Sequence, residues 1–212
     1  MMFGKERHMQ EIIARLKKIY PDPRTELHYK TPFELLAATI LSAQATDSSV
    51  NRATGRLFKK YKSIGEFAGA SLPELEKDVS SINFYRNKAK NIKTCAEIIM
   101  EKYGGKVPRT MAELTGLPGV ARKTANIVLS NAFGLNEGIA VDTHVKRLSG
   151  RLGLTSKTDP VKIEQDLMAV TAREEWSDLS HLLILHGRRV CLARSPRHKD
   201  CVLYDICPSN NI

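Results

Sequence analysis

Apolar residues recur every three to four positions along much of the chain, as over residues 12–19 and again over 92–99. This spacing places them on one face of an α-helix and leaves polar residues on the other face. The apolar–polar alternation that is typical of strands is nearly absent. The pattern therefore predicts an all-α fold of about ten short helices joined by brief turns.

Capping residues mark where these helices begin. Four Ser or Thr residues have Glu three positions later, in the pairs Thr31/Glu34, Ser63/Glu66, Ser71/Glu74 and Thr110/Glu113. In such a capping box the hydroxyl accepts a hydrogen bond from a main-chain N–H of the first helical turn. Pro32 and Pro73 stand where a first turn tolerates proline, and Asp159-Pro160 opens a helix in the same way. No internal repeat or long linker divides the chain.

The composition of the chain indicates what kind of molecule it binds. Lys and Arg outnumber Asp and Glu by 33 to 23, giving a net charge of +10 and a pI near 9.5, which favours a polyanion such as nucleic acid. The N-terminus has no apolar segment typical of a signal peptide, and no apolar run reaches membrane-spanning length. In a chain without an export signal, the four cysteines are expected to be thiols or metal ligands rather than disulfides.

One segment carries most of the candidate chemistry. It runs Leu-Pro-Gly-Val-Ala-Arg-Lys-Thr-Ala over Leu117–Ala125, and Asp142, in the block Val141–His144, stands nineteen positions after the lysine. Gly119 has no Cβ, so its main chain can approach an anion closely, and the next helix points its positive end the same way. Lys123 then provides an amine and Asp142 a carboxylate. A phosphate-binding turn with these two groups indicates chemistry on nucleic acid.

This segment resembles the helix-hairpin-helix motif of DNA glycosylases, and the whole chain resembles the endonuclease III family. Three further blocks support the resemblance in the expected order: Leu41–Asp47, Val141–His144 and the cysteine-rich tail Cys191–Cys207. The resemblance implies a two-lobed all-α fold. A six-helix lobe at residues 23–134 would carry the hairpin, residues 1–22 and 135–212 would form the second lobe, and the catalytic cleft would lie between them.

The resemblance also implies a function. The chain would be a bifunctional DNA glycosylase and AP lyase that removes oxidised pyrimidines from damaged duplex DNA, as a monomer in the cytoplasm associated with the nucleoid. Lys123 would attack C1′ of the sugar and form a Schiff base, and Asp142 would stabilise the positive charge that develops there. The alternative interpretation of Lys123 is a surface lysine that only contacts phosphate. The alternative interpretation of Asp142 is a helix N-cap, and this role is compatible with catalysis. His144 is expected to be a structural residue.

Rival functions lie inside and outside this enzyme class. Adenine or mismatch glycosylases of the same fold generally lack the lysine found at position 123. The 8-oxoguanine branch keeps that lysine but generally lacks the cysteine tail. A non-catalytic DNA-binding module is the rival from another class, because hairpin motifs also serve as tethers.

Residues for DNA contact follow from the same resemblance. Gln44 matches the residue inserted opposite the orphan base after the damaged base is flipped out. Phe84 would be a second wedge, or else a loop anchor buried in the core. The remaining candidates are the hairpin residues Gly119, Val120, Ala121 and Arg122 and the tail residues Arg194, Arg197 and Lys199. Ala121 replaces a second glycine of the family motif, and alanine fits if this residue is already helical.

The cysteine tail departs from its family at one position. The family holds a [4Fe–4S] cluster on four cysteines with six, two and five residues between them. Here the spacing is kept, but the four positions read Cys191, His198, Cys201 and Cys207. His198 could ligate iron, the cluster could be incomplete, or a Cys3His set could hold zinc. Cys95 lies on an apolar stripe and is expected in the core.

Overall fold

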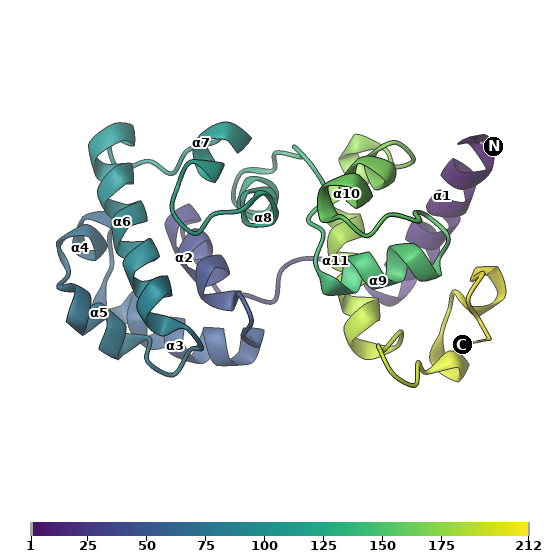
Figure 1. Ribbon diagram of the computed structural model, residues 1–212, viewed down its shortest axis with the longest axis horizontal. Helices are drawn as coiled ribbons and strands as arrows, with labels where there is room; N and C mark the ends of the chain where they lie inside the picture. Colours follow the sequence, from purple (N-terminus) through teal and green to yellow (C-terminus); the bar gives the residue numbers. More distant parts are fainter. Residues whose placement is uncertain (1, 212) are drawn as a thin grey trace. The chain divides into compact units, whose positions relative to one another are not determined.

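The computed structural model describes residues 2–211, and its regular structure is helical throughout (Figure 1). These residues form eleven α-helices and three short 3₁₀ helices, without a strand. The chain divides into two compact units, one made of Glu26–Leu135 and the other of Met1–Thr25 with Asn136–Ile212. We call them the hairpin unit and the loop unit. The predicted all-α fold class is confirmed. The predicted lobes and the cleft between them stay a prediction.

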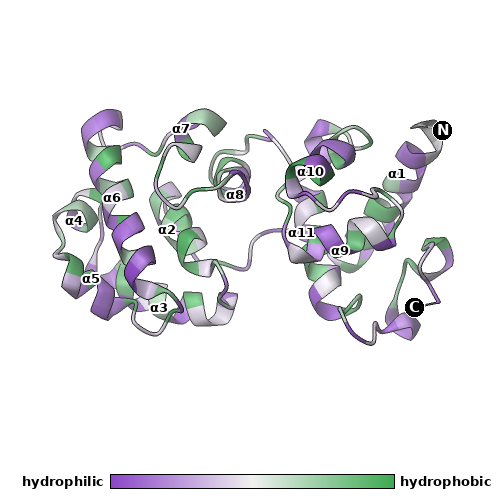
Figure 2. Cartoon of the chain, in the orientation of Figure 1, coloured by the Kyte–Doolittle hydropathy of each residue, from purple (hydrophilic) through white to green (hydrophobic). Residues whose placement is uncertain are grey.

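The hairpin unit is built around two long helices. Its helices are α2 (Pro32–Ser42), α3 (Asp47–Lys60), α4 (Ile64–Gly69), α5 (Leu72–Asp78), α6 (Tyr85–Tyr103), α7 (Met111–Thr115) and α8 (Arg122–Phe133). Helix α2 is buried continuously over residues 35–41 and is mostly hydrophobic in Figure 2. Helix α6 is amphipathic and buries one stripe that includes Ile92, Cys95 and Ile99. Cys95 is fully buried, so its predicted place in the core is confirmed.

The resemblance implied six helices in this region, whereas the hairpin unit holds seven. The short helices α4 and α5 are separate because Ala70 and Ser71 between them have extended ψ angles of 143° and 136°. Two extended residues break the helical hydrogen-bond ladder, so the chain turns between the two helices.

The predicted caps form at most of the expected positions. The hydroxyls of Thr31, Ser63 and Thr110 accept from the N–H of the Glu three residues later, at 3.2 Å in each case. Ser71 starts α5 without a side-chain cap, so its predicted capping box is wrong. Helix α3 begins at Asp47, but the capping side chain is that of Thr46, which accepts from Ser49 N–H.

The loop unit packs its first helix against its last. It contains α1 (Met2–Ile19), α9 (Thr143–Arg151), α10 (Pro160–Met168), η1 (Arg173–Glu175), α11 (Trp176–Arg189), η2 (His198–Asp200) and η3 (Tyr204–Ile206). Met9, Ile12 and Leu16 of α1 are fully buried in the same core as the leucines of α11. None of the helices among the described residues is long and apolar enough to cross a membrane.

Candidate active site and metal centre

The hairpin turn between α7 and α8 depends on one glycine. Gly119 has a φ of +75°, a conformation that residues with a Cβ rarely adopt. A Cβ at this position would stand 2.5 Å from Nδ2 and 3.0 Å from Cγ of Asn91. The thiol of Cys95, one turn further along α6, donates to the carbonyl oxygen of Pro118 at 3.2 Å. Asn91 and Cys95 of α6 therefore pack against the turn. Neither contact was predicted from the sequence.

Lys123 lies exposed in the first turn of α8. The N-cap of this helix is Ala121, with φ −83° and ψ 168°, and it provides no side-chain cap. Ala121 is thus not helical, and alanine fits here because its φ is negative. The N–H groups of a first helical turn have no acceptor within the helix, and the helix dipole adds positive charge there. This end of α8 is therefore suited to bind an anion.

Two further predicted contacts, Gln44 and Phe84, lie on neighbouring loops of the hairpin unit. Gln44 follows α2, Phe84 is the N-cap of α6, and both have positive φ angles, of 53° and 57°. The side-chain amide of Asn83 donates to the carbonyl oxygen of Gln44 at 3.4 Å. Phe84 is 65% exposed, so the alternative that it anchors the loop in the core is wrong. Gln44 is exposed as well.

A cavity of about 550 Å³ lies beside the start of α2 and the residues that follow the end of α6. It is lined by the start of α2, the start of α4 and residues 105–109 after α6. None of the predicted site residues lines it. The predicted site residues of this unit lie instead on the exposed loops at Gln44 and Phe84 and at the hairpin turn.

Asp142 belongs to the loop unit and is the N-cap of α9. Its Oδ1 accepts from the N–H groups of His144 and Val145, at 2.8 and 2.9 Å. These two bonds fix the direction of the carboxylate. His144 lies against Gly187 of α11. Nη2 of Arg147, on the same helix as His144, is 3.2 Å from its Nδ1, and burial lowers the pKa of the imidazole. The capping role of Asp142 is thus present.

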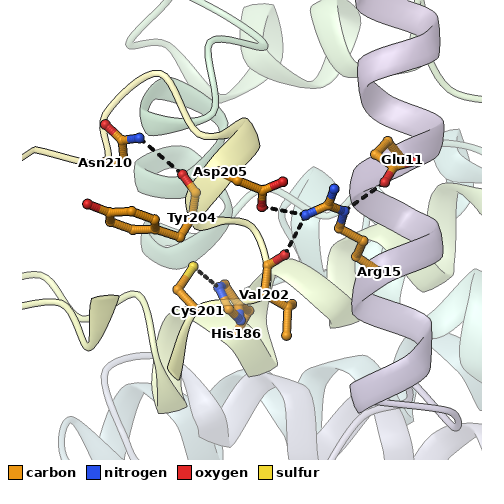
Figure 3. Close-up of polar contacts among 8 residues, drawn as sticks. All are labelled: Glu11, Arg15, His186, Cys201, Val202, Tyr204, Asp205 and Asn210. Carbon is orange, nitrogen blue, oxygen red and sulfur yellow. Dashed lines mark hydrogen bonds and ion pairs between the residues drawn. The ribbon is translucent and has the colours of Figure 1, made fainter. Parts of the chain in front are cut away.

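The cysteine loop, residues 190–211, is held mainly by arginine side chains. Arg151 of α9 donates to the carbonyl oxygens of Leu192 and Ala193, at 2.7 and 3.0 Å, and to the sulfur of Cys191 at 3.3 Å. Figure 3 shows a second tie, in which Arg15 of α1 contacts the Val202 carbonyl at 3.0 Å. Guanidinium groups suit this task because they present several donors in a fixed plane.

The four predicted ligands lie in this loop and border a common cavity. Cys191, His198, Cys201 and Cys207 all line one cavity, which Arg151 and Tyr204 also border. The ring of His198 lies 5.6 Å from that of Tyr204, and the sulfur of Cys201 is 3.5 Å from Nε2 of His186 (Figure 3). Arg194, Arg197 and Lys199 are exposed on the same loop.

Comparisons with known proteins agree with this architecture. The family model described as "HhH-GPD superfamily base excision DNA repair protein" matches residues 37–173. The chain belongs to this superfamily. It is 50% identical over 208 residues to endonuclease III of Synechocystis sp., covering 98% of this chain and 95% of that protein, and 43% identical over 198 residues to endonuclease III of Escherichia coli K12, covering 93% of each.

A solved structure points the same way. The structure of a trapped endonuclease III–DNA covalent intermediate matches with a TM-score of 0.91 at 44% identity, covering 97% of this chain and 96% of that one. The predicted membership of the endonuclease III family is confirmed. So is the predicted class of enzyme, a base excision repair DNA glycosylase and AP lyase of the HhH-GPD superfamily. The roles of single residues stay predictions.

The donor set of the cysteine loop is chemically compatible with the cluster that the resemblance implies. Three thiols and one imidazole are ligands that both iron–sulfur clusters and zinc accept. Among the described residues, however, no three His, Cys, Asp or Glu side chains are arranged as a metal-binding group. The four side chains share a cavity, and binding requires them to turn toward one centre.

Proposed function

We propose that this glycosylase removes oxidised pyrimidines from damaged duplex DNA and then cleaves the strand, with Lys123 as its nucleophile. The observation that carries the proposal is the position of Lys123 in the first turn of α8, directly after the Gly119 turn. The turn and the helix end bind backbone phosphate. An amine placed there reaches the deoxyribose that the phosphate belongs to.

The reaction proceeds by covalent catalysis. The neutral Nζ of Lys123 attacks C1′, and the base leaves with the electron pair of the N-glycosidic bond. Opening of the sugar gives an iminium between Lys123 and C1′, which acts as an electron sink. Loss of a proton from C2′ then expels the 3′ phosphate by β-elimination, and hydrolysis of the iminium releases the enzyme.

Asp142 supplies the negative charge for this reaction. The carboxylate stabilises the positive charge that the sugar acquires as the bond to the base breaks. Its two hydrogen bonds from the N–H groups of α9 hold it in one orientation. Charge and orientation can be separated by substitution, because asparagine caps a helix as well as aspartate does but carries no charge.

The target base must leave the helical stack before Lys123 reaches C1′. We assign Gln44 to the space opposite the orphan base and Phe84 to the neighbouring step. Both side chains are exposed on loops with positive φ angles, and an aromatic ring can enter a base step as a wedge. Arg122, Val120 and Ala121 contact phosphate at the hairpin, and Arg194, Arg197 and Lys199 do so at the cysteine loop.

Borohydride trapping on a duplex with one thymine glycol tests the catalytic assignment. The wild-type protein is expected to form a covalent adduct, and Lys123→Met to form none. Lys102→Met, an exposed lysine in the last turn of α6, is the matched control and should trap like wild type. Trapping by Lys123→Met would refute the nucleophile assignment. A wild-type protein that binds the duplex but never traps would be a tether.

We further propose that Cys191, His198, Cys201 and Cys207 hold a structural [4Fe–4S] cluster, with His198 as the fourth ligand. The kept spacing and the shared cavity support this. When bound, the cluster closes the loop for DNA contact. Anaerobic protein with close to four irons, and nitrogen coupling in pulsed EPR of its reduced cluster that His198→Cys removes, would support the assignment. One zinc per chain would refute the cluster.

The enzyme is expected to act alone on chromosomal DNA. A single chain carries the proposed nucleophile, the carboxylate and both wedge residues, so no second subunit is required for the reaction. We therefore propose a monomer in the cytoplasm, associated with the nucleoid. Sedimentation equilibrium across a hundredfold range of protein concentration, with and without DNA, measures the assembly state, and a dimer of constant mass would contradict it.

A further inference from the structure

Lys88 of α6 is a buried lysine that the proposed reaction does not use. Its side chain is 6% exposed, and burial lowers the pKa of its ammonium group. Lysine is almost never buried to this degree without partners that satisfy its charge. Its partners therefore indicate what the residue does.

Those partners are main-chain carbonyls at the end of α2. The ammonium group donates to the carbonyl oxygens of Leu41 at 2.8 Å and of Ala43 at 2.6 Å. The last carbonyl oxygens of a helix receive no hydrogen bond from an N–H inside it, and its C-terminus carries partial negative charge. A cation that donates two hydrogen bonds there satisfies both needs. Ala43 is the C-cap of α2, and Gln44 follows it directly.

The contact with Ala43 also orients Gln44. The Ala43 carbonyl and the Gln44 N–H belong to one rigid peptide plane, so a hydrogen bond to that oxygen fixes the plane from which Gln44 departs. Gln44 has a φ of 53°, which is unfavourable for a residue other than glycine and persists only where neighbours hold it. Lys88 is one such neighbour, and Asn83 is another through the Gln44 carbonyl.

Lys88 is also close to the loop before α6, which carries Phe84, the second proposed wedge residue. Its main-chain N–H donates to the carbonyl oxygen of Phe84 at 3.2 Å, and Phe84 also has a positive φ, of 57°. This bond is the first i to i−4 hydrogen bond of α6. Lys88 therefore stands one helical turn after Phe84, while its side chain binds the loop after α2. These loops lie at the same end of the hairpin unit (Figure 1).

We propose that Lys88 is a positioning residue for base flipping, which holds the Gln44 and Phe84 loops together so that both side chains enter the DNA in register. The inference rests on the proposed wedge role of these two residues. Lys88 touches neither DNA nor the reacting sugar. Its effect is confined to the step in which a base leaves the stack.

The test compares a substrate that needs flipping with one that does not. Lys88→Met keeps the length of the side chain and removes its donors, and Lys90→Met, exposed on the same helix, is the matched control. On a duplex with one thymine glycol, the single-turnover rate of Lys88→Met is expected to fall about tenfold to a hundredfold, as displaced positioning groups do. Trapping on a single-stranded oligonucleotide with an abasic site should stay at the wild-type level.

Fluorescence of 2-aminopurine beside the lesion follows the flipping step directly, and its rise should slow in Lys88→Met in parallel with the rate. In the background of Gln44→Ala, Lys88→Met should add little, because two residues that act through one loop are not additive. Asn83→Ala, an exposed substitution, should slow the duplex reaction in the same direction by a smaller factor.

Several results would overturn the inference. If Lys88→Met lost equal activity on the duplex and on the single strand, the substitution would have impaired folding only. If Lys88→Met cleaved the duplex at the wild-type rate while Gln44→Ala was impaired, Gln44 would keep its wedge role and Lys88 would have no part in it. Additive effects of Lys88→Met and Gln44→Ala would mean independent roles. An unimpaired Gln44→Ala would overturn the wedge role and the inference together. Absence of any wild-type trapping would instead refute the proposed function.

Discussion

The hairpin turn and the cysteine loop are two irregular segments of this protein, both proposed to contact DNA, and they are held in different ways. The turn is specified by missing atoms, since Gly119 allows a φ of +75° and leaves room for Asn91. The loop is specified by added donors, since Arg151 and Arg15 reach its carbonyls from α9 and α1. The turn should therefore fail when atoms are added, and the loop when donors are removed.

The largest effect is expected from Gly119→Ala. A left-handed conformation costs an alanine about 1–2 kcal/mol, and the new Cβ would also press on Asn91, so we expect a total loss of about 2–4 kcal/mol in the free energy of unfolding. Gly134→Ala is the control, because Gly134 has a φ of +67° with nothing near its Cβ position. Urea denaturation measures both, and equal losses would mean that Asn91 yields freely.

Removing a donor from the loop should have a slightly smaller effect. Arg151→Met deletes the hydrogen bonds to Leu192 and Ala193, and leaving these acceptors unpaired is expected to cost about 1–3 kcal/mol. The loss should be local, so amide hydrogen exchange should quicken over residues 190–211 and stay unchanged in the hairpin unit. Arg56→Met, an exposed arginine of α3, is the control. Uniform acceleration across both units would contradict local support.

Acid should weaken the loop unit through a buried histidine. The pKa of His181 is lowered to about 4, mainly by burial and to a lesser extent by nearby Arg188, and Asp178 and Asp142 oppose the shift. The unfolded chain binds the proton near pH 6.5, so stability present above that pH is lost as the pH falls toward 4. We expect a loss of about 2 kcal/mol between pH 7 and 5 from this residue.

The single tryptophan of the chain, Trp176, lies in the loop unit and reports its unfolding by fluorescence. His181→Gln should reduce the acid-dependent loss measured by urea denaturation at the two pH values by about 2 kcal/mol. The part that comes from His186, whose pKa burial also lowers to about 4, should remain. A variant with the same pH dependence as wild type would assign the effect to other groups.

The smallest effect concerns salt. If Lys199 of the cysteine loop neutralises one phosphate, Lys199→Ala should lower the slope of log K against log salt by about 0.9 for duplex DNA. Lys157→Ala, an exposed lysine elsewhere in the loop unit, should leave the slope unchanged. Equal slopes for Lys199→Ala and wild type would show that this lysine stays away from the backbone, and the loop would then matter for structure alone.

The amino-acid sequence by itself determined the helices and most of their caps. Thr31, Ser63 and Asp159 cap as expected, and Cys95 is buried as its stripe predicts. These features follow from residues within four positions of each other, where hydrogen-bond geometry leaves few choices. The same locality explains why the hairpin and the spacing of the cysteine tail were legible, and why they led to the right family.

Only the tertiary structure decided which residues from other helices contact these local features. The exposure of Phe84, the contact of Asn91 with the Gly119 turn, and the reach of Lys88 to Ala43 join residues from different helices. Hydrophobicity predicted a core place for Phe84 as readily as an exposed one, because an aromatic side chain in a loop fits either. Packing settles such choices, since a buried charge or a positive φ is tolerated only where distant neighbours compensate for it.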